Sequence, residues 1–201
     1  MPRRGLHSKQ QLEELIIAAA TELIEAEGLD AASTRRIAVK IGYTHGTVHS
    51  HYENFGDLIL KINAETLNQL YKSLDKVSSK SKSDEKAIYA IAHAYVDYGL
   101  KNNNRWKALY EFNYPREDGE DLPEWYDKHV KKNFALVESR ISHFCSSPAQ
   151  ARISAQVLWS SLHGIAILAL TGKLDTVKAK STKKLVDYFV EIYLNGLKKA
   201  L

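Results

Sequence analysis

The sequence is poor in cysteine, glycine and proline, and it contains no long hydrophobic run. Its single cysteine, Cys145, excludes an internal disulfide and a cysteine-based zinc site. No window approaches the roughly 18 consecutive apolar residues that a membrane span needs. The basic first eight residues also lack the apolar stretch of a secretory signal. These absences predict a reduced, cytoplasmic protein that does not enter a membrane.

Ten glycines and four prolines among 201 residues leave long stretches without a helix breaker. Apolar residues recur at intervals of three and four, and no segment shows the sustained alternation that is typical of strands. The sequence therefore predicts an all-α fold of about nine helices. The expected helices span residues 8–27, 34–41, 45–51, 55–77, 84–102, 104–112, 123–145, 149–172 and 181–200.

Charge is distributed unevenly near the N-terminus, although the formal net charge is only +4. Residues 1–12 carry three bases and no acid, and residues 13–30 carry six acids and no base. Residues 31–52 contain Arg35, Arg36 and Lys40 without a carboxylate, in a chain that has 24 acids. A surface depleted of negative charge suits a polyanion such as DNA. The alternative is that the acids fell elsewhere by chance.

The acid-free stretch also has the organisation of a helix-turn-helix, predicted over residues 33–52. Ser33 or Thr34 can cap a first short helix, Gly42 can end it with a positive φ, and Thr44 can cap a second. Small and polar residues follow on the second helix, where they let the backbone approach the major groove. Apolar residues at intervals would lock the two helices together; these are Ile37, Ile41 and Val48.

Three histidines of this stretch have two interpretations. His45 and His49 lie four residues apart, so one helix face could present both to a metal ion. His51 would point away from that face, and no carboxylate lies nearby. We therefore expect the histidines to face DNA, and we expect neither a metal site nor a cofactor.

Residues 8–68 resemble the TetR family of bacterial transcriptional regulators, through a leading amphipathic helix that ends at Glu27-Gly28 and through Ile37-Ala38, Gly42, Gly46-Thr47-Val48, His51-Tyr52 and Leu58-Ile59. The resemblance implies a DNA-binding domain over residues 8–68 and a ligand-binding and dimerisation domain over residues 69–201. It implies phosphate contacts from Thr34, Thr44, His49 and Tyr52. It implies positions near the bases for Arg35, His45, Gly46, Thr47, Ser50 and His51.

The sequence departs from the family's usual pattern at three positions. His49 stands where the family usually has tyrosine, Phe55 where it usually has lysine, and Gly56 where it usually has an acid. That lysine commonly touches the DNA backbone, so Phe55 removes an expected phosphate contact. A basic N-terminal arm in the minor groove is a possible substitute.

The remaining two thirds of the chain contain most of the aromatic residues. Aromatic residues on helices are usually part of the core, but a mostly apolar cavity with a few polar tips is also how proteins hold small ligands. The residues predicted to line a ligand pocket are Tyr95, Tyr98, Trp106, Tyr110, Phe112, Trp125 and His163. For His163, the alternative is a core histidine bonded to a neighbouring helix.

A Trp-x-x-x-His-Gly pattern, at Trp159, His163 and Gly164, resembles the WHG-type C-terminal domain found in a branch of TetR regulators. A glycine inside a helix costs about 1 kcal/mol relative to alanine, so we expect a close approach at Gly164. In this family the last two helices pair with those of a second copy. The resemblance therefore implies a homodimer interface that contains Trp159, Leu185, Phe189, Ile192, Tyr193 and Leu197.

These observations predict a dimeric regulator that binds a palindromic operator in double-stranded DNA and is released from it by a small molecule. Repression is favoured by the resemblance alone. A DNA-binding architectural or protein-interaction protein without an effector is the alternative. The sequence has no P-loop, no Gly-x-Ser-x-Gly elbow and no His-Glu-x-x-His motif, so we do not expect an enzyme.

Overall fold

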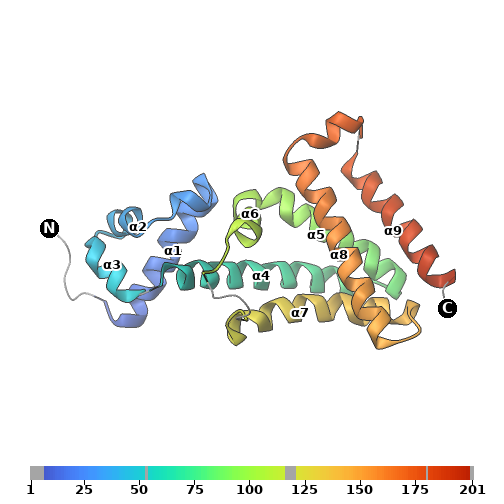
Figure 1. Ribbon diagram of the computed structural model, residues 1–201, viewed down its shortest axis with the longest axis horizontal. Coiled ribbons are helices and arrows are strands. Elements are labelled where there is room, and N and C mark those ends of the chain that lie inside the picture. Colours follow the sequence, from blue (N-terminus) through green and yellow to red (C-terminus); the bar gives the residue numbers. More distant parts are fainter. Residues whose placement is uncertain (1–6, 53, 116–120, 180, 200–201) are drawn as a thin grey trace. The chain divides into compact units, whose positions relative to one another are not determined.

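Nine α-helices and three short 3₁₀ helices account for most of the residues that the computed structural model describes, which are 7–52, 54–115, 121–179 and 181–199. The α-helices are α1 (Lys9–Glu27), α2 (Thr34–Ile41), α3 (His45–His51), α4 (Phe55–Ser79), α5 (Asp84–Lys101), α6 (Asn103–Glu111), α7 (Glu124–Ile141), α8 (Pro148–Leu170) and α9 (Thr182–Lys199). The described part of the chain contains no strand, and the predicted all-α class is confirmed. Figure 1 shows the helices in chain order.

Helix ends lie where the sequence provides capping groups. Ser8 forms a capping box with Gln11 at the start of α1. Ser33 and Thr44 accept the amide hydrogens of Arg36 and Thr47, and so cap α2 and α3. These caps fix the starts of the short helices, which have too few residues to be stable in isolation.

The described residues form two compact units. The first comprises the residues up to Thr66 together with Asn102–Asp127, and the second comprises Leu67–Lys101 and the residues from Lys128 onward. The segment that contains α6 therefore packs with the N-terminal helices. The predicted domains 8–68 and 69–201 are each one continuous stretch of the chain, whereas each of the two compact units combines two stretches. The predicted domain bounds stay a prediction.

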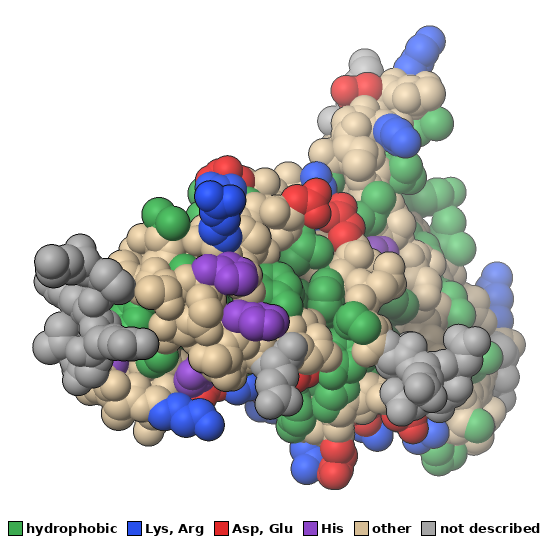
Figure 2. All heavy atoms as spheres, turned by 60° about the vertical axis from the view of Figure 1, so that its left-hand side comes forward, with side chains coloured by type: hydrophobic (Ala, Val, Ile, Leu, Met, Phe, Trp, Pro, Cys, Tyr) green, Lys and Arg blue, Asp and Glu red, His purple; other side chains and the backbone are tan. Residues whose placement is uncertain are grey.

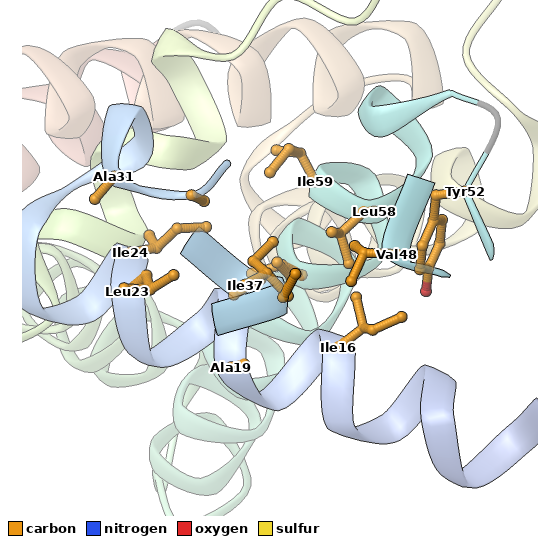
Figure 3. Packing of buried hydrophobic residues seen from close by; sticks show 14 of the residues in the cluster. Ile16, Ala19, Leu23, Ile24, Ala31, Ile37, Val48, Tyr52, Leu58 and Ile59 are labelled. Atoms are coloured by element: carbon orange, nitrogen blue, oxygen red, sulfur yellow. The ribbon is translucent and has the colours of Figure 1, made fainter. Parts of the chain in front are cut away.

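The core of the first unit lies where α1, α2, α3 and the start of α4 converge (Figure 3). Ile16 of α1, Ile37 of α2, Val48 of α3 and Leu58 of α4 are each fully buried there. Burying a side chain of this size contributes about 1.5–3 kcal/mol. Shared burial rather than helix propensity therefore holds the two short helices in place.

The second unit is built mainly from α5, α8 and α9, which pack pairwise on one another. Ile88 of α5, Leu158 of α8 and Val190 of α9 are buried between them. Polar contacts join the helices as well. His93 Nε2 lies 2.6 Å from Asp187 Oδ1, and the Tyr193 hydroxyl donates to the Ser154 carbonyl at 2.7 Å.

Candidate DNA-binding interface

The helices α2 and α3 form a helix-turn-helix with the geometry that the sequence predicts. Gly42 ends α2 with a φ of 74°, in the left-handed region that glycine adopts without a steric cost. Tyr43 and Thr44 then complete the turn, and α3 begins at His45. Because Ile37 and Val48 point into the core, the opposite faces of both helices remain in solvent.

Most of the residues predicted to contact DNA lie on that solvent face. The exposed ones are Arg35, Thr44, His45, Gly46, His49 and Ser50, and Thr34 and Thr47 are half-buried. Figure 2, which turns this end of the chain toward the reader, shows histidine side chains grouped on the surface near Lys and Arg side chains. The exposed part of the predicted site is thus one continuous face of α2 and α3.

His51 and Tyr52, which were also predicted to contact DNA, are not on this face. The His51 side chain is 7% exposed, and Tyr52 is 6% exposed. Both turn inward toward Glu13 of α1, whose carboxylate also receives a hydrogen bond from Lys61 of α4. The two residues thereby hold the C-terminal end of α3 from inside the unit.

The Glu13 carboxylate is the point at which α1, α3 and α4 meet electrostatically. Lys61 donates to Oε1, the Tyr52 hydroxyl donates to the same oxygen at 3.4 Å, and His51 Nε2 lies 3.8 Å from Oε2. The hydrogen bond from Lys61 is the main reason that the Glu13 pKa lies below its usual value. Burial beside Glu13 raises the pKa of Tyr52, which is therefore a neutral donor.

Direct contacts on the exposed face set the positions of the α3 side chains. Thr34 Oγ1 of α2 lies 2.8 Å from His45 Nε2, and the rings of His45 and His49 stack with their centroids 6.0 Å apart. Thr44 Oγ1 lies 2.8 Å from Thr47 Oγ1. Among the described residues, no group of three or more His, Cys, Asp or Glu side chains could hold a metal ion.

Two of the three bases in the acid-free stretch are paired with acids of α1. Arg36 forms a two-pronged ion pair with Glu27, at 2.6 and 3.0 Å. Lys40 Nζ lies 2.8 Å from Glu22 Oε2. The hydrogen bonds from Arg36 lower the pKa of Glu27. Counting charges segment by segment along the sequence did not reveal these ion pairs, because α1 and α2 come together only in the folded unit.

The two unusual residues at the start of α4 have structural roles. Phe55 is half-buried and packs against the core of the first unit. A Cβ atom on Gly56 would lie 3.2 Å from both the Tyr114 ring and the Pro115 ring, and 2.8 Å from Asn54 Oδ1. The missing side chain therefore lets the segment after α6 lie directly against α4.

The residues predicted to line a ligand pocket are divided between the two units. Trp106, Tyr110, Phe112 and Trp125 belong to the first unit, and Tyr95, Tyr98 and His163 to the second. Trp106 is fully buried and Trp125 is 41% exposed. Only Phe112 lines the cavity of the first unit, of about 270 Å³, which is formed by Leu60, Asn63, Leu109, Phe112, Asn113, Tyr114, Leu122 and Tyr126.

His163 lies in an aromatic cluster of the second unit. Its ring stacks on Trp159 with the centroids 5.6 Å apart, and Nδ1 lies 3.2 Å from the Tyr95 hydroxyl. The ring of Phe134 in turn packs against the ring of Trp159. Burial lowers the pKa of His163, so its imidazole is neutral at pH 7.

The predicted dimer residues differ in what they contact within the chain. Trp159 and Tyr193 are engaged by Phe134 and Ser154, whereas Ile192 is 54% exposed. A row of exposed residues at intervals of three and four also follows α8. It consists of Ile153, Val157, Ser160, Gly164 and Leu168. Together with the exposed Tyr188 and Ile192 of α9, we call these seven residues the α8–α9 stripe.

A close approach at Gly164 was predicted, and it does not occur within the described part of the chain. A Cβ atom at this position would meet nothing within 4 Å. The glycine instead lies exposed in the middle of the α8–α9 stripe.

Sequence comparisons identify two family matches that together cover most of the chain. Residues 16–62 match the description "Bacterial regulatory proteins, tetR family". Residues 88–193 match the description "Tetracyclin repressor-like, C-terminal domain". The second match includes Trp159, His163 and Gly164.

Two relatives and one solved structure are similar to this chain over between 41% and 98% of its length. The uncharacterized HTH-type transcriptional regulator Rv0681 of Mycobacterium tuberculosis is 25% identical over 82% of this chain and 72% of its own. The nicotine-responsive transcriptional repressor HdnoR of Paenarthrobacter nicotinovorans is 33% identical over 41% of this chain and 40% of its own. A protein of unknown function from Rhodococcus sp. RHA1 has the same fold, with a TM-score of 0.77 at 20% identity, over 98% of this chain and 99% of its own.

Proposed function

Because the chain belongs to the TetR family of DNA-binding transcriptional regulators, we propose that it acts as a homodimeric repressor that a small molecule releases from a two-fold symmetric operator. The observation that carries the DNA-binding part is the exposed, acid-free face of α2 and α3. Arg35, Thr47 and His49 lie on it.

The geometry of α3 supports its role as the recognition helix. Its side chains are short or planar, so the helix backbone can come close to the base edges in the major groove. His45 is bonded to Thr34 and stacked on His49, and both imidazoles are therefore ordered before DNA binds. Ordered side chains lose less conformational entropy on binding.

The α8–α9 stripe supports the dimer. Ile153, Val157 and Leu168 of α8 expose 59%, 45% and 42% of their surface, and Tyr188 and Ile192 of α9 expose 65% and 54%, which is unusual for large apolar or aromatic side chains in such numbers. The helix α8 is long and apolar enough by composition to span a membrane, a property that core helices of soluble proteins share. A second copy packed on the stripe would bury its apolar side chains, and Gly164 would allow close contact between helices. Two-fold pairing also presents two recognition helices to a palindromic site.

Release by a small molecule is supported by the family and by one relative. The HdnoR repressor is described as nicotine-responsive, and effector binding couples to DNA binding by about 1–3 kcal/mol in typical allosteric proteins. A DNA-binding architectural protein without an effector is the alternative. It predicts operator affinity that is indifferent to every metabolite tested.

The DNA interface is tested by the double variant Thr47→Ala/His49→Ala. DNA fragments that the wild-type protein selects from the host genome provide the operator. We expect the variant to lose specific binding by at least about 30-fold, since the two DNA-facing side chains each contribute roughly 1–3 kcal/mol. Binding is measured by fluorescence anisotropy, and helix content by circular dichroism.

The matched control is Thr176→Ala/His143→Ala, which changes the same residue types at exposed positions outside α2 and α3. This control should bind the operator as the wild type does. An unchanged footprint of the Thr47/His49 variant would move the DNA interface away from α3.

A further inference from the structure

Two imidazoles lie side by side on the exposed, acid-free face of α2 and α3. His45 and His49 are both exposed, and their rings stack at an interplanar angle of 12° with the centroids 6.0 Å apart. Figure 2 shows histidine side chains together on this surface. Histidine is the side chain whose charge ordinarily changes between about pH 5 and pH 8. The face that is proposed to contact DNA therefore carries groups that can gain a positive charge near neutral pH.

The acids of α1 that contact α2 are paired with bases rather than with these imidazoles. Glu22 pairs with Lys40, and Glu27 pairs with Arg36. The remaining base of α2, Arg35, is exposed. Neither imidazole forms an ion pair with any residue that the structure describes.

On the inner side of α3, the charged groups of α1 and α4 also have partners of their own. Glu13 of α1 interacts with Lys61 of α4, with Tyr52 and with His51. Asp57 of α4 accepts a hydrogen bond from the segment that follows α6. Since no described carboxylate pairs with the exposed imidazoles, a DNA phosphate is the anion that their protonated forms can meet.

Thr34 allows His45 to gain a proton without losing its contact with α2. Thr34 Oγ1 lies 2.8 Å from His45 Nε2. A hydroxyl can donate to an unprotonated imidazole nitrogen or accept from an N–H, and an imidazolium has two N–H donors. The bond therefore persists after protonation, with the imidazolium donating and the hydroxyl oxygen accepting. The hydroxyl hydrogen of Thr34 can then be donated to a phosphate oxygen.

The stacked geometry opposes protonation of both rings in the free protein. Two imidazolium rings would place positive charges 6.0 Å apart, and each charge disfavours the other. A phosphate beside the rings offsets this repulsion, because a nearby opposite charge favours the charged form. Bound DNA therefore raises the affinity of the pair for protons, and protons raise the affinity for DNA by the same factor.

From these contacts, and resting on the proposed role of α2 and α3 in operator binding, we propose that His45 and His49 take up protons from the solvent when the protein binds its operator. The imidazolium forms donate charge-assisted hydrogen bonds to phosphate oxygens, which are stronger than those of the neutral rings. Operator affinity therefore increases as the pH falls from about 8 toward about 6. The regulator holds its operator more tightly under mildly acidic conditions.

The first test measures operator binding by the full-length wild-type protein between about pH 7.5 and pH 6.5. Titration calorimetry in two buffers of different ionisation enthalpy gives the number of protons taken up on binding. We expect about one proton per bound dimer, which by linkage corresponds to about a tenfold gain in affinity over this interval. An affinity that stays constant or falls as the pH decreases, or an uptake of no protons, would overturn the proposal.

NMR titration of the imidazole resonances tests the two side chains directly. The resonances of His45 and His49 are assigned by their absence from the spectra of His45→Gln and His49→Gln. In the wild type, operator DNA should move both titration midpoints upward by about one pH unit, which is a tenfold gain in proton affinity. This measurement does not require either variant to bind DNA. A midpoint that is unchanged or lowered at either residue would contradict uptake by the pair.

Two other histidines provide matched controls. His7 Nδ1 lies 2.7 Å from the Tyr43 hydroxyl in the turn between α2 and α3, and His143 is exposed in the second unit. His7→Gln and His143→Gln should take up as many protons as the wild type does. Loss of the uptake in either control would place the proton coupling outside α3 and overturn its assignment. Circular dichroism at each pH verifies that every protein is folded.

The proton coupling and the proposed function fail in different ways. Wild-type protein that binds its operator with the same affinity at every pH would refute the coupling and leave the DNA interface intact. Wild-type protein that does not bind its operator at any pH in this range would refute the proposed function.

Discussion

At the scale of single residues, Glu13 is the partly buried partner on which the orientation of α3 depends. Its carboxylate accepts hydrogen bonds from Lys61 and Tyr52, and His51 lies within ion-pair distance of it. None of these contacts is visible in the sequence, since the partners lie more than 35 positions away. A carboxylate that receives several hydrogen bonds contributes more than an exposed surface pair does.

We expect Glu13→Gln to lower the free energy of unfolding by roughly 1–3 kcal/mol at pH 7, because it removes a charged acceptor from Lys61 and from the buried Tyr52 hydroxyl. The neighbouring Glu14→Gln changes an exposed acid and should alter stability by less than about 0.5 kcal/mol. Urea denaturation measures both. Equal effects of the two substitutions would contradict the role assigned to Glu13.

The sign of the pH dependence follows from the lowered pKa of Glu13. The folded state holds this carboxylate charged more strongly than the unfolded state does, so its contribution is complete above the ordinary pKa of 4.5. It is lost as the pH falls through the lowered value. The stability difference between wild type and Glu13→Gln should therefore shrink below pH 4.5.

At the scale of helices, the contact of α5 with α8 buries His163 at a position that disfavours the protonated, charged form of its imidazole. Tyr95 of α5 and Trp159 of α8 enclose His163, and burial lowers its pKa below 6.5. The unfolded chain therefore binds a proton first as the pH falls. The contribution of His163 to stability should therefore decline from about pH 6.5 downward.

His163→Gln should reduce this loss of stability between pH 6.5 and the lowered pKa of the imidazole. His143→Gln, at an exposed position after α7, is the control and should retain it. Thermal unfolding followed at 222 nm across this pH range makes the comparison. An unchanged pH profile of His163→Gln would show that another group causes the decline.

The helices themselves were predictable because their signals are local. Periodic apolar residues and the caps at Ser33, Thr44 and Gly42 lie within a few positions of the elements that they define, and the α2 and α3 bounds were predicted to the residue. The exposed face of α3 followed from the same pattern. The contacts of His51 and Tyr52 with Glu13 did not, since they join distant parts of the chain.

The cavity of the first unit could not be predicted for a related reason. Aromatic composition drew attention to Trp106 and Trp125, which are a buried core residue and an exposed residue. Asn63, one of the residues that line the cavity, lies in a helical stretch of the sequence with nothing unusual around it. Only the packing of α6 on α4 uses one of its amide atoms and leaves the other facing no protein donor.

At the scale of the whole molecule, a single copy leaves the apolar α8–α9 stripe in water. We expect Val157→Asp to convert the proposed dimer to monomers, because a charge in the middle of an apolar interface costs several kcal/mol when it is desolvated. Sedimentation velocity measures the oligomeric state. The adjacent exposed Gln156→Asp is the control and should sediment as the wild type does.

Trp159→Asp would be a poorer probe of the same interface. Trp159 stacks on His163 and packs against Phe134 within its own chain, so its replacement would damage the second unit itself. A Val157→Asp protein that still sediments as a dimer would place the interface on a different surface.

The ion pairs of α1 with α2 have a consequence for how binding responds to ionic strength. Affinity for DNA falls with added salt in proportion to the number of condensed cations that the protein displaces from the duplex. Arg36 and Lys40 are already paired with the carboxylates of Glu27 and Glu22. On binding DNA, these two bases therefore displace few condensed cations from the duplex. Arg35 carries most of this effect within residues 31–52, and recognition by this regulator depends more on groove contacts than its count of basic residues suggests.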